Sequence, residues 1–154
     1  MGSNFNKSYV TWKEVEEGVF DIVDQLREWK PDVIFGLSNG GVVPATLIAK
    51  YYNVPVRTVV IQLRDGIIED LGSFRSSLWE EYANMNVLVV DDINDTGSTF
   101  NTLLGNIDHY PTTIKTAVLH SNIGSKFTVD VTSVVLDKEF DDVWIVYPWE
   151  SFLE

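Results

Sequence analysis

VLVVDDINDTGST, residues 87–99, is a short apolar run followed by two carboxylates and a cluster of small hydrogen-bond donors. The β-branched run 87–90 is typical of a strand buried on both faces of a parallel sheet. Apolar positions then recur at helical spacing, so we predict a helix from about Thr99 to His109. A strand, a loop and a helix in this order are the building block of α/β folds.

The same strand, turn and helix pattern occurs upstream. Residues 32–38 read as a buried strand, Asn39-Gly40-Gly41 turns the chain, and Pro44 to Tyr52 reads as a helix. An earlier helix begins with a Thr11/Glu14 capping box and ends before Pro31. Further strands are predicted at 56–61, 114–119, 129–136 and 143–147. We therefore expect an α/β fold with a central, mostly parallel sheet flanked by helices on both faces.

The composition points to one compact domain, residues 1–154. The chain is 45% hydrophobic and 22% charged, without a repeat or a Pro/Gly/Ser-rich linker. It has no cysteine, no stretch long and apolar enough to span a bilayer, and no signal-peptide pattern in its first 12 residues. The expectation is a soluble, cytoplasmic protein without a membrane partner.

The net charge of -12 restricts the partners. A surface this acidic repels phosphate backbones, so we expect no nucleic-acid partner. A site for anionic phosphates on this chain would need backbone amides, helix N-termini or divalent cations to offset the repulsion.

Residues 62–84 show no clear period. A structureless stretch of this length within a compact domain is usually functional, often as a lid. A mobile β-hairpin is the alternative.

The loop after residue 90 suits a sugar phosphate. Its hydroxyls and amides lie where a helix begins, and Gly97 permits close approach of the backbone. Asp91 and Asp92 can accept hydrogen bonds from a ribose diol or hold Mg²⁺ through water. The alternative is an acidic loop that only caps a helix, but the complete string after an apolar strand favours the phosphate site.

VLVVDDINDTGST resembles the phosphoribosyl-diphosphate signature of type I phosphoribosyltransferases. Three other segments resemble the xanthine-guanine, hypoxanthine and related purine phosphoribosyltransferases of bacteria and archaea: Tyr9–Trp12, Ser38–Pro44 and Trp144–Glu150. Their order and spacing match over most of the chain, whereas residues 62–84 and 127–142 match poorly.

The resemblance implies a type I phosphoribosyltransferase fold with a flexible lid at about 62–84 and a small C-terminal hood at about 121–154. It implies a Mg²⁺-dependent enzyme that transfers phosphoribosyl from 5-phosphoribosyl-1-diphosphate to a 6-oxopurine (guanine, xanthine or hypoxanthine), as in purine salvage. Relatives are often dimers or tetramers, so a homo-oligomer is expected.

The resemblance also assigns residues to the phosphoribosyl site. Asp91 and Asp92 would contact the ribose hydroxyls and the Mg²⁺–diphosphate complex, the metal mainly through water. Asp95 would be the general base, or an electrostatic partner, near purine N7. The 5-phosphate would be held by Thr96, Gly97, Ser98 and Thr99.

The diphosphate and the base would meet other segments. The implied diphosphate loop, in which a cis peptide would aim an amide inward, consists of Ser38, Asn39 and Gly40. Trp144 would stack on the base, and the Ile145 backbone would read its edge, while residues 62–84 would close over the site. A core role for Trp144 is the alternative.

Two positions depart from the family pattern. Asn39 stands where these enzymes usually carry Arg, so the diphosphate loop has no charge there. Asn122, or Ser121, stands where the purine enzymes carry the Lys that donates to the oxygen at purine C6, and Lys126 lies nearby. An amide could donate to a 6-oxo group or accept from a 6-amino group. Two alternatives therefore remain: a non-catalytic phosphoribosyl- or nucleotide-binding regulator, and a phosphoribosyltransferase for another base.

Overall fold

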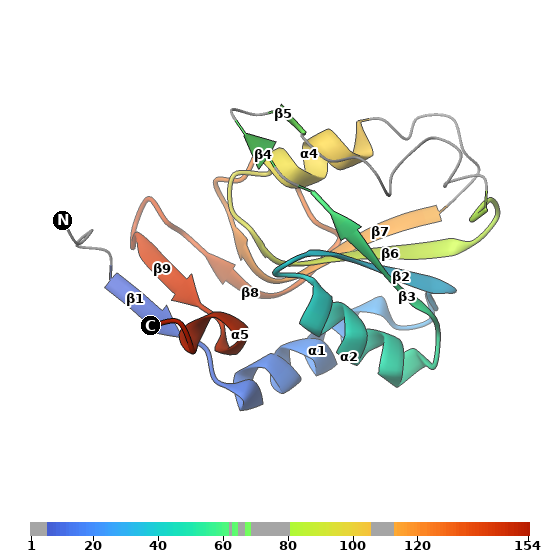
Figure 1. Ribbon diagram of the computed structural model, residues 1–154, viewed down its shortest axis with the longest axis horizontal. Helices are drawn as coiled ribbons and strands as arrows, with labels where there is room; N and C mark the ends of the chain where they lie inside the picture. Colours follow the sequence, from blue (N-terminus) through green and yellow to red (C-terminus); the bar gives the residue numbers. More distant parts are fainter. Residues whose placement is uncertain (1–5, 62, 65–66, 69–80, 106–112) are drawn as a thin grey trace.

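The computed structural model describes residues 6–61, 63–64, 67–68, 81–105 and 113–154. Its centre is a five-stranded sheet in the order β3-β2-β6-β7-β8, and every neighbouring pair is parallel (Figure 1). The strands are β2 (Val33–Ser38), β3 (Val56–Val60), β6 (Asn86–Asn94), β7 (Thr113–Asn122) and β8 (Val131–Leu136). The predicted parallel sheet is confirmed.

Helices cover both faces of this sheet, as predicted. The helices α1 (Trp12–Leu26) and α2 (Val42–Tyr52) lie on one face and α4 (Ser98–Leu104) on the other (Figure 1). The central strand β6 contributes side chains to the cores on both faces of the sheet. Leu88 and Val90 pack in the core under α1 and α2, whereas Val87 and Val89 pack in the core under α4. All four are fully buried, which explains the unbroken apolar run.

The predicted cap of α1 is confirmed. Thr11 Oγ1 accepts a hydrogen bond from Glu14 N over 3.1 Å, and Thr11 Oγ1 lies 3.2 Å from Glu14 Oε1. The next turns bury Val15, Val19 and Ile22 against the sheet.

A small second sheet forms the hood. Its strands are β1 (Asn6–Tyr9) and β9 (Val143–Val146), which pair in parallel, and α5 (Pro148–Ser151) follows (Figure 1). The boundaries of the hood differ from the predicted 121–154, because β8 belongs to the central sheet and the N-terminal β1 completes the hood. All four residues of β1 are exposed, so the sequence has no apolar pattern that would predict this strand.

The strand that carries the two aspartates is longer than predicted. It continues through Asn94, because Ile93 pairs with His120 and Asn94 with Ser121 of an equally extended β7. The predicted loop start at Asp91 is therefore wrong, and the loop begins at Asp95. The helix α4 starts at Ser98 and ends at Leu104 with Gly105 as its C-cap, so it is shorter than the predicted helix that runs to His109, a residue that lies outside the described part of the chain.

Most of the predicted lid, residues 62–84, lies outside the described residues. Within it, β4 (Leu63–Arg64) and β5 (Ile67–Ile68) pair antiparallel, as the hairpin alternative requires. At its end, Tyr82 is buried, and its ring meets Phe35 of β2 edge-on at 5.1 Å. None of the described helices is long and apolar enough to cross a membrane.

Candidate active site

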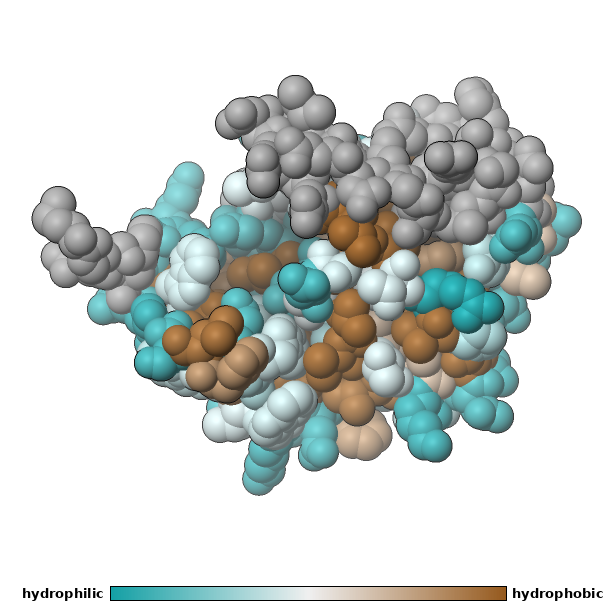
Figure 2. Space-filling model, viewed as in Figure 1, coloured by the Kyte–Doolittle hydropathy of each residue, from teal (hydrophilic) through white to brown (hydrophobic). Residues whose placement is uncertain are grey.

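The carboxyl ends of β2, β6, β7 and β8 meet at one edge of the sheet and carry the candidate residues. A cavity of about 620 Å³ opens there, lined by Asn39, Gly40, Asp92, Trp149, Glu150, Phe152, Leu153 and Glu154. The C-terminal residues Phe152 and Leu153 are 77% and 80% exposed, and Figure 2 shows brown side chains on the surface at this end of the chain. Ligands of parallel α/β sheets bind at this edge.

The loop between β2 and α2 lies directly against Asp92. The peptide bond between Ser38 and Asn39 is cis, as expected from the resemblance, and Ser38 Oγ donates to Asn39 Oδ1 over 2.6 Å. A Cβ atom added at Gly40 would lie 2.5 Å from Cγ of Asp92, which only glycine avoids. The loop backbone and the Asp92 carboxylate therefore border one space.

Asp91 and Asp92 are partly buried neighbouring carboxylates. Asp91 Oδ1 accepts from Asp92 N over 2.8 Å, and Asp92 Oδ1 accepts from Ile93 N over 2.7 Å. Burial, and then the charge of Asp92, raise the pKa of Asp91 well above its usual value. Burial likewise raises the pKa of Asp92 to about 6. Two desolvated carboxylates side by side are stabilised by a nearby cation.

The donor set suits a hard divalent cation. Carboxylate oxygens are the protein ligands that Mg²⁺ prefers, and it commonly takes only one or two of them beside water and substrate phosphates. No group of three His, Cys, Asp or Glu residues in the described parts of the chain is arranged to hold a metal. Asp91 and Asp92 would leave most positions around such an ion to water and substrate.

Replacing Asp92 by Asn should stabilise the metal-free protein. The pKa of Asp92 is about 6 in the folded state, against about 3.9 in the unfolded state, so its ionisation costs stability. This cost is absent below about pH 3, grows as the pH rises from about 4 to 6, and is fully present above about pH 7. Chemical denaturation at pH 8 in EDTA should show Asp92→Asn more stable than wild type by roughly 2–3 kcal/mol.

At pH 4 this difference should shrink to about 0.5 kcal/mol or less. The matched control is Asp142→Asn, because Asp142 is exposed. A gain for Asp92→Asn that is equal at both pH values would contradict the assigned burial cost.

The loop 95–99 has the backbone of an anion cradle. Gly97 has a φ of 90° and precedes Ser98, the first residue of α4. Thr96 Oγ1 lies 3.1 Å from Ser98 Oγ and accepts from Ser98 N over 3.3 Å, which folds both hydroxyls onto the turn. Successive amides in a turn of this kind form a concave anion site.

Residues 125–127, which follow β7, hold the loop 95–99 in place through hydrogen bonds. Asn94, which is 2% exposed, donates through Nδ2 to Phe127 O over 2.7 Å and accepts from Ser125 Oγ over 2.9 Å. Lys126 N donates to Thr96 O over 2.9 Å. Sequence reasoning missed the role of Asn94, since one Asn within a loop motif carries no signal of burial.

Asp95 lies in a polar cluster with Asn122 and Lys138. Lys138 Nζ lies 3.0 Å from Asp95 Oδ2, and Asn122 Nδ2 donates to Asp95 O over 3.2 Å. The Lys138 side chain is 15% exposed and that of Asp95 43%. Lys138 was missed, because it follows β8 in a segment with little resemblance to the family. The sequence signal that could have indicated a site residue was the position of Lys138 just after the carboxyl end of β8, the neighbour of β7.

The aromatic residues of the hood have separate roles. Trp144 lies on β9 and is 50% exposed, so the core alternative for its ring is not supported. Ile145 is buried and pairs with Ser8 in the hood sheet. Trp149 stacks on Tyr147 at 4.9 Å with an interplanar angle of 1°, which is a packing contact.

Tyr147 connects the hood to the site. Its hydroxyl donates to Asp92 O over 3.1 Å and lies 2.9 Å from His120 Nδ1. Burial raises the pKa of Tyr147 and lowers the pKa of His120. Because the tyrosine O–H donates to Asp92 O, the contact with the tyrosine oxygen requires His120 Nδ1 as the donor. These contacts hold the Asp92 backbone in place.

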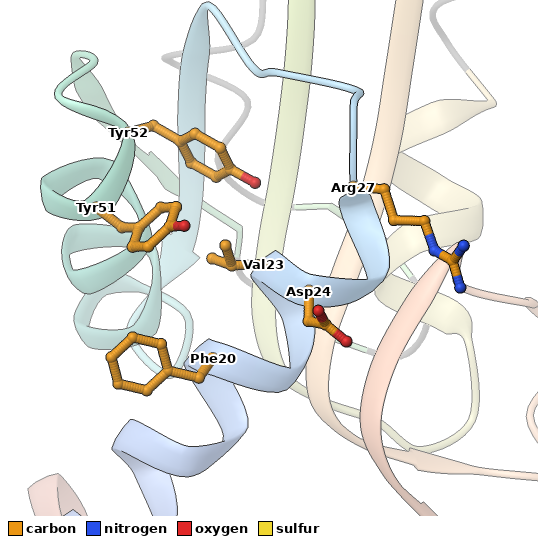
Figure 3. A pocket seen from close by; sticks show the side chains of 6 residues that line it. All are labelled: Phe20, Val23, Asp24, Arg27, Tyr51 and Tyr52. Atoms are coloured by element: carbon orange, nitrogen blue, oxygen red, sulfur yellow. The ribbon is translucent and has the colours of Figure 1, made fainter.

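Another pocket, of about 470 Å³, lies away from this edge. It is lined by Phe20, Val23, Asp24, Arg27, Tyr51 and Tyr52 (Figure 3). These residues come from α1, from its C-cap Arg27 and from the C-terminal end of α2, and the chain continues from there to the amino ends of β2 and β3. The pocket shares no residue with the cluster around Asp92 and Asp95.

Comparisons with known proteins agree with this geometry. The family model described as phosphoribosyl transferase domain matches residues 6–150. A hypoxanthine-guanine phosphoribosyltransferase of Schizosaccharomyces pombe is 23% identical over 82% of this chain and 80% of its own length. A xanthine-guanine phosphoribosyltransferase of Chromohalobacter salexigens is 28% identical over 92% of this chain and 82% of its own. The crystal structure of a purine phosphoribosyltransferase from Pyrococcus horikoshii superposes with a TM-score of 0.75 and 27% identity, covering 95% of both chains.

Proposed function

The chain belongs to the phosphoribosyl transferase domain family, and from this premise we propose that it transfers the phosphoribosyl group of 5-phosphoribosyl-1-diphosphate to a 6-oxopurine base. The products are a nucleoside monophosphate and diphosphate, and guanine, xanthine and hypoxanthine are the candidate bases. One observation carries the proposal: the Asp92 carboxylate borders the Gly40 loop, and the strand that carries Asp91 and Asp92 leads directly into the hydroxyl-rich turn 95–99 at the start of α4. The purine enzymes among the relatives support the choice of base.

The proposed binding follows from the chemistry of each segment. The amides and hydroxyls of Thr96–Thr99 receive the 5-phosphate, which an acidic surface would otherwise repel. Asp91 and Asp92 accept hydrogen bonds from the ribose hydroxyls and hold Mg²⁺ mainly through water. When bound, Mg²⁺ offsets the charge that develops on the diphosphate leaving group.

The diphosphate lies at the second loop. The backbone of Ser38, Asn39 and Gly40 borders the same space as the Asp92 carboxylate and offers amides to the diphosphate oxygens. Asn39 contributes an uncharged amide, so the loop relies on hydrogen bonds.

Transfer exchanges one bond at the ribose C1 carbon. The bond from C1 to the diphosphate oxygen breaks and a bond from purine N9 to C1 forms, while Asp95 accepts the proton that the purine loses at N7. The exposed ring of Trp144 stacks on the base and the Ile145 backbone reads its edge. Residues 62–84 are proposed to exclude water during transfer.

The experiment that tests this proposal is a panel of bases. The full chain is incubated with Mg²⁺, phosphoribosyl diphosphate and guanine, xanthine, hypoxanthine, adenine or uracil, and both products are measured. We expect diphosphate and nucleoside monophosphate in equal amounts with at least one 6-oxopurine, and a loss of turnover in EDTA. Diphosphate release no higher with any base than without one would overturn the proposal.

A second candidate function is a non-catalytic nucleotide-binding regulator. It is favoured by Asn39, which brings no charge to the diphosphate loop. Tight nucleoside monophosphate binding without turnover in the same assay would select it. Turnover with uracil or adenine alone would select a phosphoribosyltransferase for another base.

The assembly and the cellular location complete the proposal. We propose a homo-oligomer of two or four chains, whose mass light scattering on the full chain would measure. The cytoplasmic location stays a prediction.

A further inference from the structure

We propose that Lys138 is the residue that selects a 6-oxopurine over a 6-aminopurine, by donating from its ammonium group to the oxygen at purine C6. This inference rests on the proposed function, because it places the base beside Asp95. It places the selecting cation in the turn that follows β8, and not at Asn122 or Ser121 at the end of β7, where the purine enzymes carry their Lys.

The first support is the position of the ammonium. Lys138 Nζ lies 3.0 Å from Asp95 Oδ2, and Asp95 is the carboxylate proposed to meet purine N7. In a 6-oxopurine, N7 and the oxygen at C6 lie on the same edge of the ring. A base whose N7 approaches Asp95 therefore presents its C6 substituent close to the partner of that carboxylate.

The second support is that Asn122 is already engaged. Asn122 Nδ2 donates to Asp95 O and Asp95 Oδ1 over 3.2 and 3.4 Å. Asn122 Oδ1 accepts from Lys138 N and Gly124 N over 3.2 and 3.4 Å. The amide thus holds the turn of Lys138 and the carboxylate of Asp95 together, and Asn122 is a positioning residue.

The third support is the difference between the two lysines near the loop. Lys126 is exposed, and its backbone makes the contacts: Lys126 N donates to Thr96 O, and Lys126 O accepts from Asn101 Nδ2 over 3.4 Å. The side chain of Lys138 is only 15% exposed and points to Asp95. A largely desolvated cation discriminates between partners more strongly than an exposed one.

The chemistry of the ammonium sets the preference. It has three N–H donors and no acceptor, and the contact with Asp95 uses one of the three. It can donate to a carbonyl oxygen, whereas a 6-amino group would bring another donor against it. An unpaired donor of this kind disfavours the wrong base.

The test compares Lys138→Met and Lys138→Arg with wild type. Calorimetry measures the affinities for inosine monophosphate and adenosine monophosphate, and the assay gives kcat/KM for hypoxanthine and adenine. We expect wild type to prefer the 6-oxo compounds in both measurements. Lys138→Met should lower this preference by about 10- to 100-fold, chiefly through weaker binding of the 6-oxo compounds. Lys138→Arg should retain part of it, because the charge and the donors remain.

Lys126→Met is the matched control, since it removes a cation from the same region and should leave the preference unchanged. The inference is overturned if folded Lys138→Met keeps the wild-type preference, if Lys126→Met loses it, or if wild type prefers the 6-amino compounds. If wild type binds inosine monophosphate but transfers to no base, the proposed function fails, and the affinity ratio still decides the role of Lys138. If neither nucleotide binds, both proposals fail.

Discussion

Asp95→Ala is expected to lower kcat for nucleoside monophosphate formation by about 10²- to 10⁴-fold, the usual contribution of a general acid or base. The side chain lies at the turn between β6 and α4 and is 43% exposed, so substrate can reach it. Since Asp95 acts on the base, the KM for phosphoribosyl diphosphate should change little. Steady-state kinetics with saturating base measures both quantities.

The comparison variants separate chemistry from charge. Asp95→Asn retains the shape and the contact with Lys138 but accepts no proton, so its kcat should fall about as far as that of the alanine variant. Asp141→Ala removes a carboxylate from an exposed turn and should behave as wild type. An Asp95→Asn enzyme with nearly normal kcat would rule out proton transfer to this residue.

Gly97→Ala is expected to abolish tight binding of the 5-phosphate. The backbone at Gly97 has a φ of 90°, where a side chain is strained. A Cβ atom there would also lie 2.6 Å from Phe127 N and 2.7 Å from Ser125 Oγ, closer than real Cβ contacts. The turn must therefore rearrange, and we expect the KM for phosphoribosyl diphosphate to rise by more than about tenfold, with a stability loss of roughly 1–3 kcal/mol.

Gly124→Ala is the matched control in the neighbouring loop. A Cβ atom there would lie 3.6 Å from Asn122 Nδ2, an ordinary contact, and Gly124 has no positive φ. Its KM should match that of wild type. If Gly97→Ala bound phosphoribosyl diphosphate normally while folded, the turn 96–99 would not be the phosphate cradle.

Much of the fold was readable from the sequence, because its signals are local. The valine and leucine residues 87–90 pack into the cores on both faces of the sheet. Because both faces are buried, the strand is a continuous apolar run, and such a run predicts a parallel strand. The Thr11 cap and the glycine turn at 39–41 likewise depend on nearby residues alone. The pairing of β1 with β9 was harder to predict from the sequence, because β1 is fully exposed and β9 lies at the other end of the chain.

The site was predictable where one segment carries it. The 91–99 string placed the aspartates, the acid at 95 and the small donors in one stretch, and the structure keeps them together at the sheet edge. The Asp95–Lys138 ion pair and the contact of Tyr147 with Asp92 join residues 43 and 55 positions apart. Such contacts depend on strand order, which no local pattern reveals. This is also why the sequence did not reveal the hydrogen bond from Asn122 to Asp95.

The most direct test of the central claim is a crystal structure of the full chain with Mg²⁺ and inosine monophosphate. We predict that the 5-phosphate accepts hydrogen bonds from the amides and hydroxyls of Thr96–Thr99, with the ribose hydroxyls at Asp91 and Asp92. A nucleotide bound elsewhere, with this turn free of phosphate, would contradict it.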